Sequence, residues 1–171
     1  MIKMLGAALL VCGATVIGFL AASELSVRVR VLSGFLMAFS LMRAEIEERL
    51  SPINEVLEKI SEVAPPPLDA FFKVCAEEKE KKKDVPLSVI WSKNLLKAEC
   101  LKLKTNEREV LSEAGSILGR FSAAEQTKQI GMLIRRTESF LESAENDKKR
   151  LGGVYTKLGF ICGMALVIIF I

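Results

Sequence analysis

Residues 31–60 have the sequence VLSGFLMAFSLMRAEIEERLSPINEVLEKI, and this stretch decides the fold class. Its apolar positions are Val31, Phe35, Phe39, Met42, Ile46, Leu50, Ile53, Leu57 and Ile60. Steps of three and four residues place these side chains on one face of an α-helix. Ser51 and Pro52 interrupt the pattern, and serine followed by proline is typical of the start of a new helix. The stretch therefore predicts two amphipathic helices.

Upstream of this stretch lies an apolar segment, because residues 4–22 contain no Asp, Glu, Lys or Arg. About 20 apolar residues span a bilayer as a helix, so we expect an N-terminal transmembrane helix at 1–23. A cleaved signal peptide is the alternative, since Lys3 precedes the run and small residues close it. The run exceeds the usual signal core of about 7–15 residues, and Arg28 and Arg30 follow it. An uncleaved helix that continues without a break into the next amphipathic stretch is favoured.

Downstream, three consecutive prolines at 65–67 exclude helix continuation and predict a corner. Leu68, Phe71, Phe72 and Cys75 then predict a short amphipathic helix. It ends in residues 77–84, every one of which is charged. This run is interpreted as a solvated helix end. A docking patch is the alternative, although its mixed signs create little field to steer a partner.

After a break at residues 84–86, a third long helix is expected at about 88–118, with Gly119 as its C-terminal cap. Trp91, the single tryptophan, lies within it and is interpreted as a core or interface anchor rather than a platform for a ligand.

A fourth long helix is expected to begin at Ser122, which forms a capping box with Glu125, and to run to about Arg150. Gly152 and Gly153 follow. Two adjacent glycines give the backbone unusual freedom, so a flexible joint is predicted there.

The C-terminal residues 158–171 again lack Asp, Glu, Lys and Arg, and they are apolar on every helical face. As a helix they extend only about 21 Å, against a hydrocarbon core of about 30 Å. Including residues from Val154 onward gives about 27 Å, and Lys157 can extend its ammonium to the headgroups. We therefore predict a C-terminal transmembrane helix at 154–171. A buried core helix is the alternative.

The expected fold is all-α, an antiparallel helical bundle at 24–153 between an N-terminal and a C-terminal transmembrane helix. Basic residues flank both expected spans on the bundle side, and the positive-inside rule places such flanks in the cytoplasm. The bundle is therefore predicted to be cytoplasmic, with both termini on the opposite side of the membrane. The flanking residues are Arg28, Arg30, Lys148, Lys149, Arg150 and Lys157.

Composition argues against several classes of function. The chain has 24 Lys and Arg against 21 Asp and Glu, a net charge of +3, and no basic tract with interleaved aromatics, so nucleic-acid binding is not expected. It has no histidine, the commonest general base and metal ligand. No nucleotide-binding or hydrolase motif is present. No catalytic, cofactor-binding or metal-binding residue is predicted, nor any cofactor, and the chain is not expected to be an enzyme.

The four cysteines lie at Cys12, Cys75, Cys100 and Cys162, without the paired spacing of a zinc site. Reduced, buried thiols are favoured. A disulfide between Cys75 and Cys100 is the alternative.

Several short patterns occur in a specific order along the chain. They are MIKMLGA at the start, Ala44-Glu45-Ile46 followed by Pro52, Trp91, Glu107-x-Glu109-Val110-Leu111, Gly115-x-x-Leu118-Gly119 with Gln126 beyond, and Leu158-Gly159-Phe160 with Gly163. Between two apolar ends, this order resembles the stage III sporulation protein AB family. The family tends to carry an acidic residue in the turn after Leu-Gly. Ser122 stands there in this chain, and serine can cap a helix as aspartate does.

The resemblance implies a function. The family is similar to the F-type inner-membrane platform proteins of type II secretion and type IV pilus machines. In endospore formers it belongs to a mother-cell membrane complex that faces the forespore, contains a secretion-type ATPase and ring-forming membrane proteins, and forms a channel between the two cells. By analogy, the chain would be a non-enzymatic platform that couples the cytoplasmic ATPase to the membrane assembly, and it could form a homo-oligomer. A generic membrane-tethered scaffold or regulator of division or envelope processes is the alternative.

Four acidic residues in the family-like patterns are the candidate partner-binding residues: Glu45, Glu48, Glu107 and Glu109. The alternative for Glu45 and Glu107 is that they make intramolecular helix pairs.

Overall fold

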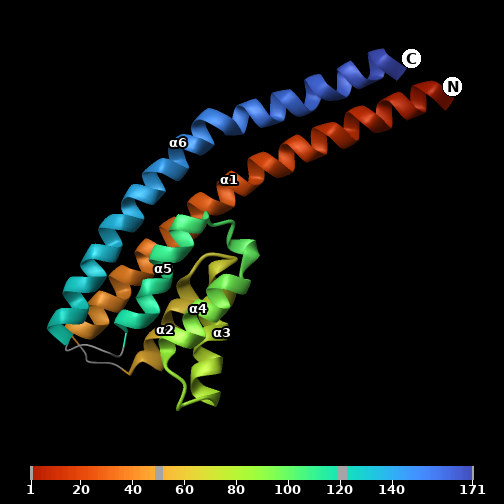
Figure 1. Cartoon of the computed structure of the whole chain (residues 1–171). Coiled ribbons are helices and arrows are strands. Elements are labelled where there is room, and N and C mark those ends of the chain that lie inside the picture. Colours follow the sequence, from red (N-terminus) through yellow and green to blue (C-terminus); the bar gives the residue numbers. More distant parts are fainter. Residues whose placement is uncertain (1, 49–51, 119–122, 171) are drawn as a thin grey trace. The chain divides into compact units, whose positions relative to one another are not determined.

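The computed structural model describes residues 2–48, 52–118 and 123–170, and within these residues the chain is helical without strands (Figure 1). The all-α expectation is therefore confirmed. The chain divides into two compact units. We call Met1–Val29 with Ser143–Ile171 the terminal hairpin, and Arg30–Glu142 the helical bundle.

Two long helices contribute to both units. Helix α1 covers Ile2–Glu48, so the expected continuous N-terminal helix is confirmed. Helix α6 covers Ala123–Phe170 and passes through Gly152 and Gly153. The expected joint at these glycines is wrong. Glycine costs a helix only about 1 kcal/mol relative to alanine, and no residue on either side forces the helix to stop.

The shorter helices belong to the bundle. They are α2 (Ile53–Val63), α3 (Leu68–Lys81), α4 (Leu87–Lys97), the 3-10 turn η1 (Glu99–Leu101) and α5 (Thr105–Ile117). The proline corner separates α2 from α3, as predicted, and Pro86 directly precedes α4. In sequence order, α2 packs on α3, α3 on α4 and α4 on α5. The predicted caps at Gly119 and Ser122, and the start of a helix at Ser51, lie outside the described residues.

The expected single helix at 88–118 is wrong, because the chain folds back between α4 and α5. Lys102 adopts the left-handed conformation with φ 51°. The Glu107 carboxylate accepts a hydrogen bond from the Lys104 backbone N–H at 2.8 Å and so satisfies a donor at the start of α5. The reversal lets α5 pack on α4 instead of extending into solvent.

Aromatic side chains from three helices form the centre of the bundle. Five rings, those of Phe35, Phe39, Phe71, Phe72 and Trp91, have neighbouring centroids 5.0 to 6.4 Å apart. The Trp91 side chain is fully buried, and its indole N–H donates to the Leu111 carbonyl oxygen at 2.9 Å. The interpretation of Trp91 as a core anchor is confirmed.

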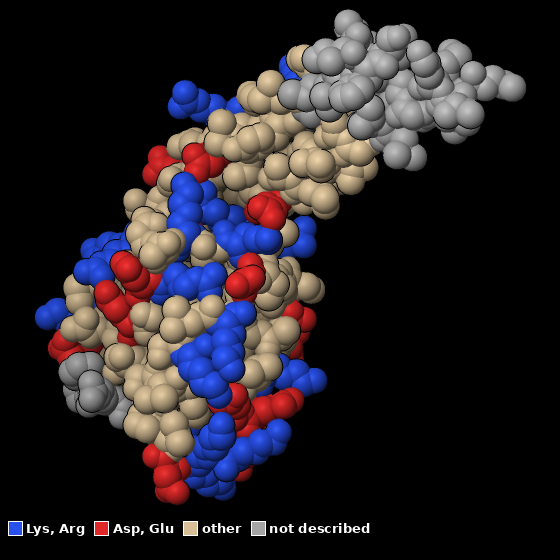
Figure 2. All heavy atoms as spheres, turned by 45° about the vertical axis from the view of Figure 1, so that its right-hand side comes forward, with Lys and Arg blue, Asp and Glu red and all other residues tan. Residues whose placement is uncertain are grey.

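The outer surface of the bundle carries intermingled charges of both signs (Figure 2). The charged run at 77–84 forms ion pairs largely with itself, for example Lys83 to Glu80 at 3.2 Å and Lys82 to Glu78 at 3.4 Å. Lys93 of α4 also donates to Glu78 of α3 at 3.2 Å, and this hydrogen bond holds the pKa of Glu78 below its ordinary value. These contacts fit a solvated helix end.

In the terminal hairpin, the first part of α1 lies beside the last part of α6 (Figure 1). Arg28 and Asp147 join the two helices by an ion pair of 2.8 Å. Among the residues searched, one helical segment, Cys12–Glu47, is long and apolar enough to cross a membrane. The C-terminal span at 154–171 stays a prediction.

Candidate partner-binding surface

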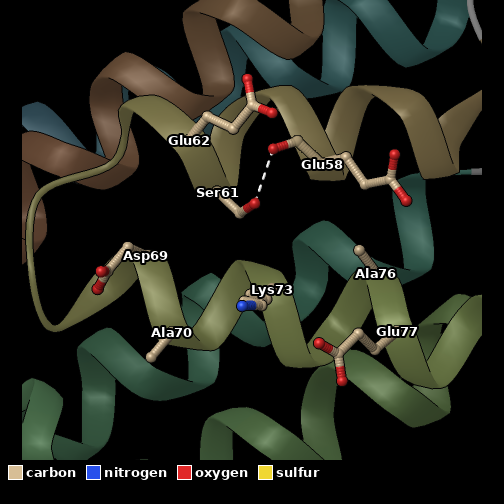
Figure 3. Close-up of a pocket in the computed structure, with 8 residues that line it drawn as sticks. All are labelled: Glu58, Ser61, Glu62, Asp69, Ala70, Lys73, Ala76 and Glu77. Carbon is tan, nitrogen blue, oxygen red and sulfur yellow. Dashed lines mark hydrogen bonds between the residues drawn. The ribbon is translucent and has the colours of Figure 1, made fainter.

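A groove of about 580 Å³ lies between α2 and α3 on the bundle (Figure 3). Helix α2 buries Val56, Leu57 and Ile60, which turns Glu58, Ser61 and Glu62 toward the groove. Helix α3 supplies the other wall, mainly with side chains outside its buried apolar face. That wall consists of Asp69, Ala70, Lys73, Ala76 and Glu77.

The groove is acidic. Four carboxylates and one ammonium line it, and most of these side chains are exposed. The Ser61 hydroxyl donates to the Glu58 backbone carbonyl at 2.7 Å, and Lys81 lies 3.8 Å from Glu77. An excess of carboxylates in a concave site attracts cationic groups. The groove therefore suits a basic segment of a partner protein. No group of three His, Cys, Asp or Glu side chains close enough to hold a metal ion occurs among the residues searched.

Two of the four predicted acidic residues are occupied within the chain. Glu45 on α1 is 7% exposed and accepts a hydrogen bond from Lys59 of α2 at 3.1 Å. Glu107 is 1% exposed and caps the start of α5 through the Lys104 N–H. Both contacts are intramolecular, but Glu45 pairs with a second helix and Glu107 caps the start of its own, so neither is a pair along one helix. They leave little of either carboxylate for a partner.

Glu109 differs from Glu107, because the Glu109 side chain is exposed on α5. The Glu48 side chain lies outside the described residues. Glu45, Glu107 and Glu109, the three predicted positions whose side chains are described, do not line the groove between α2 and α3. Docking at these residues stays a prediction, and Glu109 is the exposed one of the three whose side chains the structure describes.

Of the groove carboxylates, only Glu77 falls in a segment for which the sequence suggested docking, the run at 77–84. The groove was not predicted from the sequence, because the polar faces of two neighbouring helices were not expected to lie together. Glu58 and Glu62 are four residues apart on one helix, and Asp69 follows just after the proline corner. The tight corner between α2 and α3 brings these two short helices side by side. Their solvent-facing side chains then line the two walls of one groove.

The three cysteines whose side chains are described, Cys12, Cys75 and Cys100, are free thiols, and no disulfide joins Cys75 to Cys100. Cys75 is buried in the bundle core, and burial raises its pKa to about 12. Because the thiolate is the reactive form, Cys75 has a structural rather than a chemical role.

Together, the fold and the surface define an all-α protein with a candidate membrane helix near its N-terminus and an acidic groove on a packed bundle. A family model described as stage III sporulation protein AB matches residues 3–171. The chain therefore belongs to the stage III sporulation protein AB family, and the resemblance seen in the sequence is confirmed.

Relatives agree with this assignment. The chain is 27% identical over 170 residues to the stage III sporulation protein AB of Bacillus subtilis (strain 168), a match that covers 99% of both sequences. A solved structure of stage III sporulation protein AB (SpoIIIAB) has a similar fold, with a TM-score of 0.66 and 24% identity. That match covers 72% of this chain and 98% of the solved chain.

Proposed function

We propose that this chain is a non-enzymatic membrane platform of a sporulation channel complex. In this proposal it couples a cytoplasmic secretion-type ATPase to ring-forming membrane proteins between mother cell and forespore. One observation carries the proposal: a protein of this sporulation family combines a packed helical bundle with a hairpin whose apolar side chains face outward.

The exterior of the terminal hairpin supports a membrane location. Large apolar side chains of α1 and α6 are exposed there, among them Ile17, Phe19, Leu158 and Ile161. A hydrophobic exterior of this kind is unfavourable in water and favourable in lipid. In the proposed arrangement, both ends of the chain cross the mother-cell membrane and the bundle lies in the cytoplasm.

The chain passes between its two units twice, and each passage is helical. Both α1 and α6 run unbroken across the boundary at residues 29–30 and 142–143. A force on the bundle from a motor protein would therefore pass to the membrane along hydrogen-bonded helices rather than along loops. This continuity suits a coupling platform better than a simple tether.

The docking surface we propose for the ATPase is the acidic groove between α2 and α3, with Glu109 as a further accessible contact. A basic segment of the partner would find four carboxylates there. Steering by such a field weakens with added salt.

The test is affinity purification of the full chain from sporulating cells in mild detergent. We expect the secretion-type ATPase to be recovered with the wild type, and to be reduced at least about tenfold by Glu58→Lys with Glu62→Lys, since reversing two interfacial charges costs several kcal/mol. Glu138→Lys with Glu142→Lys is the matched control, because these glutamates are also exposed and four residues apart on one helix. Equal recovery from both variants would exclude the groove as the docking surface.

The competing function is a membrane-tethered scaffold or regulator of division or envelope processes. The same purification separates the two functions. Recovery of division proteins without the ATPase or other channel proteins would favour the scaffold and overturn the platform.

A further inference from the structure

Three consecutive cationic residues, Lys148, Lys149 and Arg150, lie on α6 within the terminal hairpin, and all three are exposed. Successive residues of a helix point about 100° apart, so the three side chains cover a broad arc of the helix surface. None of them forms an ion pair or a hydrogen bond through its side chain within the part of the chain that the structure describes. Their charge is therefore available to a ligand.

The neighbouring acidic residues do not neutralise this cluster. Asp147 is bound to Arg28 of α1 at 2.8 Å. Glu145, three residues before Lys148, is exposed and has no side-chain partner among the described residues. The cluster therefore has three unpaired cationic side chains and one unpaired carboxylate nearby, that of Glu145, among the described residues.

An apolar surface begins on the same helix a few residues C-terminal to the cluster. Val154, Tyr155, Leu158 and Ile161 are all exposed. Helix α6 is unbroken through Gly152 and Gly153, so its rise of 1.5 Å per residue places Val154 about 6 Å and Ile161 about 16 Å beyond Arg150. Tyrosine is enriched at the boundary between hydrocarbon and headgroups. This spacing sets the three cations at headgroup depth when the apolar surface enters lipid.

We propose that Lys148, Lys149 and Arg150 bind the headgroups of anionic phospholipids at the surface of the membrane that holds the terminal hairpin. The inference rests on the membrane location proposed above. Long cationic side chains can keep their stems on the apolar helix surface and extend their charges to phosphate. Each cation near an anionic membrane surface strengthens binding by up to roughly fivefold.

The test reconstitutes the full chain into vesicles of phosphatidylcholine containing spin-labelled phosphatidylglycerol or spin-labelled phosphatidylcholine. Electron spin resonance then gives the fraction of each labelled lipid immobilised by the protein. We expect the wild type to immobilise phosphatidylglycerol several-fold more strongly than phosphatidylcholine, and Lys148→Gln with Lys149→Gln and Arg150→Gln to reduce this selectivity to roughly twofold or less. Raising the salt concentration should remove the selectivity of the wild type without any substitution.

Lys81→Gln with Lys82→Gln and Lys83→Gln is the matched control. It removes the same charge from a site on the bundle where the lysines pair with Glu77, Glu78 and Glu80. The control should keep the wild-type selectivity. Equal selectivity in all three proteins, or an equal loss in both variants, would overturn the inference.

Two failures remain distinguishable. A wild-type chain that does not stay with the vesicles would overturn both this inference and the proposed membrane location. A chain that inserts but binds phosphatidylglycerol no better than phosphatidylcholine would overturn this inference alone, since recovery of the ATPase does not depend on that measurement.

Discussion

Helix α1 contributes to both units, and its side chains are arranged in opposite ways in the two. In the terminal hairpin, Phe19 is 65% exposed while Arg28 is 4% exposed and paired. In the bundle, Phe35 is fully buried and the exposed positions of α1 include Arg43 and Glu47. The bundle thus follows the pattern of a protein folded in water, and the hairpin follows the inverted pattern expected in lipid.

In the proposed membrane arrangement, one continuous helix would lie in lipid along its first part and pack in water along the rest. The backbone of α1 is helical in both units. The two parts of α1 differ in whether the large apolar residues lie on its packed face or on its exposed face. The comparison therefore makes distinct predictions for the two units. Substitutions in the bundle core should act on folding in water, whereas substitutions of the partly buried ion pair should act on the association of α1 with α6.

The largest expected effect comes from Trp91→Ala in the bundle. The change empties a site beside three phenylalanine rings, those of Phe35, Phe71 and Phe72, and leaves the Leu111 carbonyl without its indole partner. We expect the free energy of unfolding to fall by about 3–5 kcal/mol, measured by urea denaturation with far-ultraviolet circular dichroism. Trp91→Phe is the control and should lose less, because a ring remains. An unchanged midpoint for the alanine variant would mean that this cluster is not the core.

A smaller effect is expected from Gly115→Ala on α5. An alanine Cβ there would lie 2.6 Å from the Trp91 Cβ and 3.1 Å from the Ser88 Cα. The overpacking should cost about 1–3 kcal/mol in the same measurement. Gly131→Ala on α6 is the matched control, since nothing lies within 4 Å of its added methyl. That control should be neutral or stabilise by up to about 1 kcal/mol, and equal losses in the two variants would contradict the close packing of α5 on α4.

The partly buried ion pair between Arg28 and Asp147 in the hairpin should show a more modest effect. Asp147→Asn removes the charge that faces Arg28, but the Asp147 side chain is 31% exposed and is partly screened by solvent. We expect a loss of about 1–2 kcal/mol in the thermal stability of the full chain in detergent. A double-mutant cycle with Arg28→Met isolates the coupling between the two residues. A coupling energy of zero would mean that the pair does not help to hold α1 against α6.

The smallest effect on stability at neutral pH is expected from Cys75. Its burial should instead be visible in the reactivity of its thiol. In the folded protein at pH 8, alkylation of Cys75 should be at least about 100-fold slower than that of exposed Cys100, because burial keeps Cys75 protonated. Peptide mass spectrometry resolves the two sites. Denaturation in urea should abolish the difference, and comparable rates in the folded protein would contradict the burial.

The same thiol predicts the direction of a pH effect on folding. Cys75 has a pKa raised from its ordinary value of 9.0 to about 12 in the folded protein, so the unfolded chain loses this proton first. Its contribution to stability is therefore complete below about pH 9 and is lost as the pH rises toward about 12.

Periodicity was enough to predict much of the fold. The steps of three and four residues in α1, the prolines at 65–67 and the helical position of Trp91 each act locally, and the structure confirms all three. The reversal at Lys102 was not predictable in this way, because lysine rarely adopts a positive φ and the reversal depends on contacts between α4 and α5. The helix through the glycine pair was missed because glycine weakens a helix without forbidding it.

The candidate site was harder to predict than the fold. The sequence identified acidic residues by their place in family-like patterns, but burial depends on which helices are neighbours. Glu45 and Glu107 therefore proved to be internal partners. The groove depends on α2 and α3 lying side by side. The sequence predicts the proline corner between them but not the direction in which the second helix leaves it.

In the proposed arrangement, the hairpin is embedded in the membrane and the bundle lies in the cytoplasm. The most direct measurement compares alkaline phosphatase, which is active only outside the cytoplasm, fused after Ile171 or inserted after Asp84, an exposed residue of the bundle. This arrangement predicts an active enzyme after Ile171 and an inactive enzyme at Asp84, with both fusion proteins present in the membrane fraction. An inactive enzyme after Ile171, or an active one at Asp84, would contradict it.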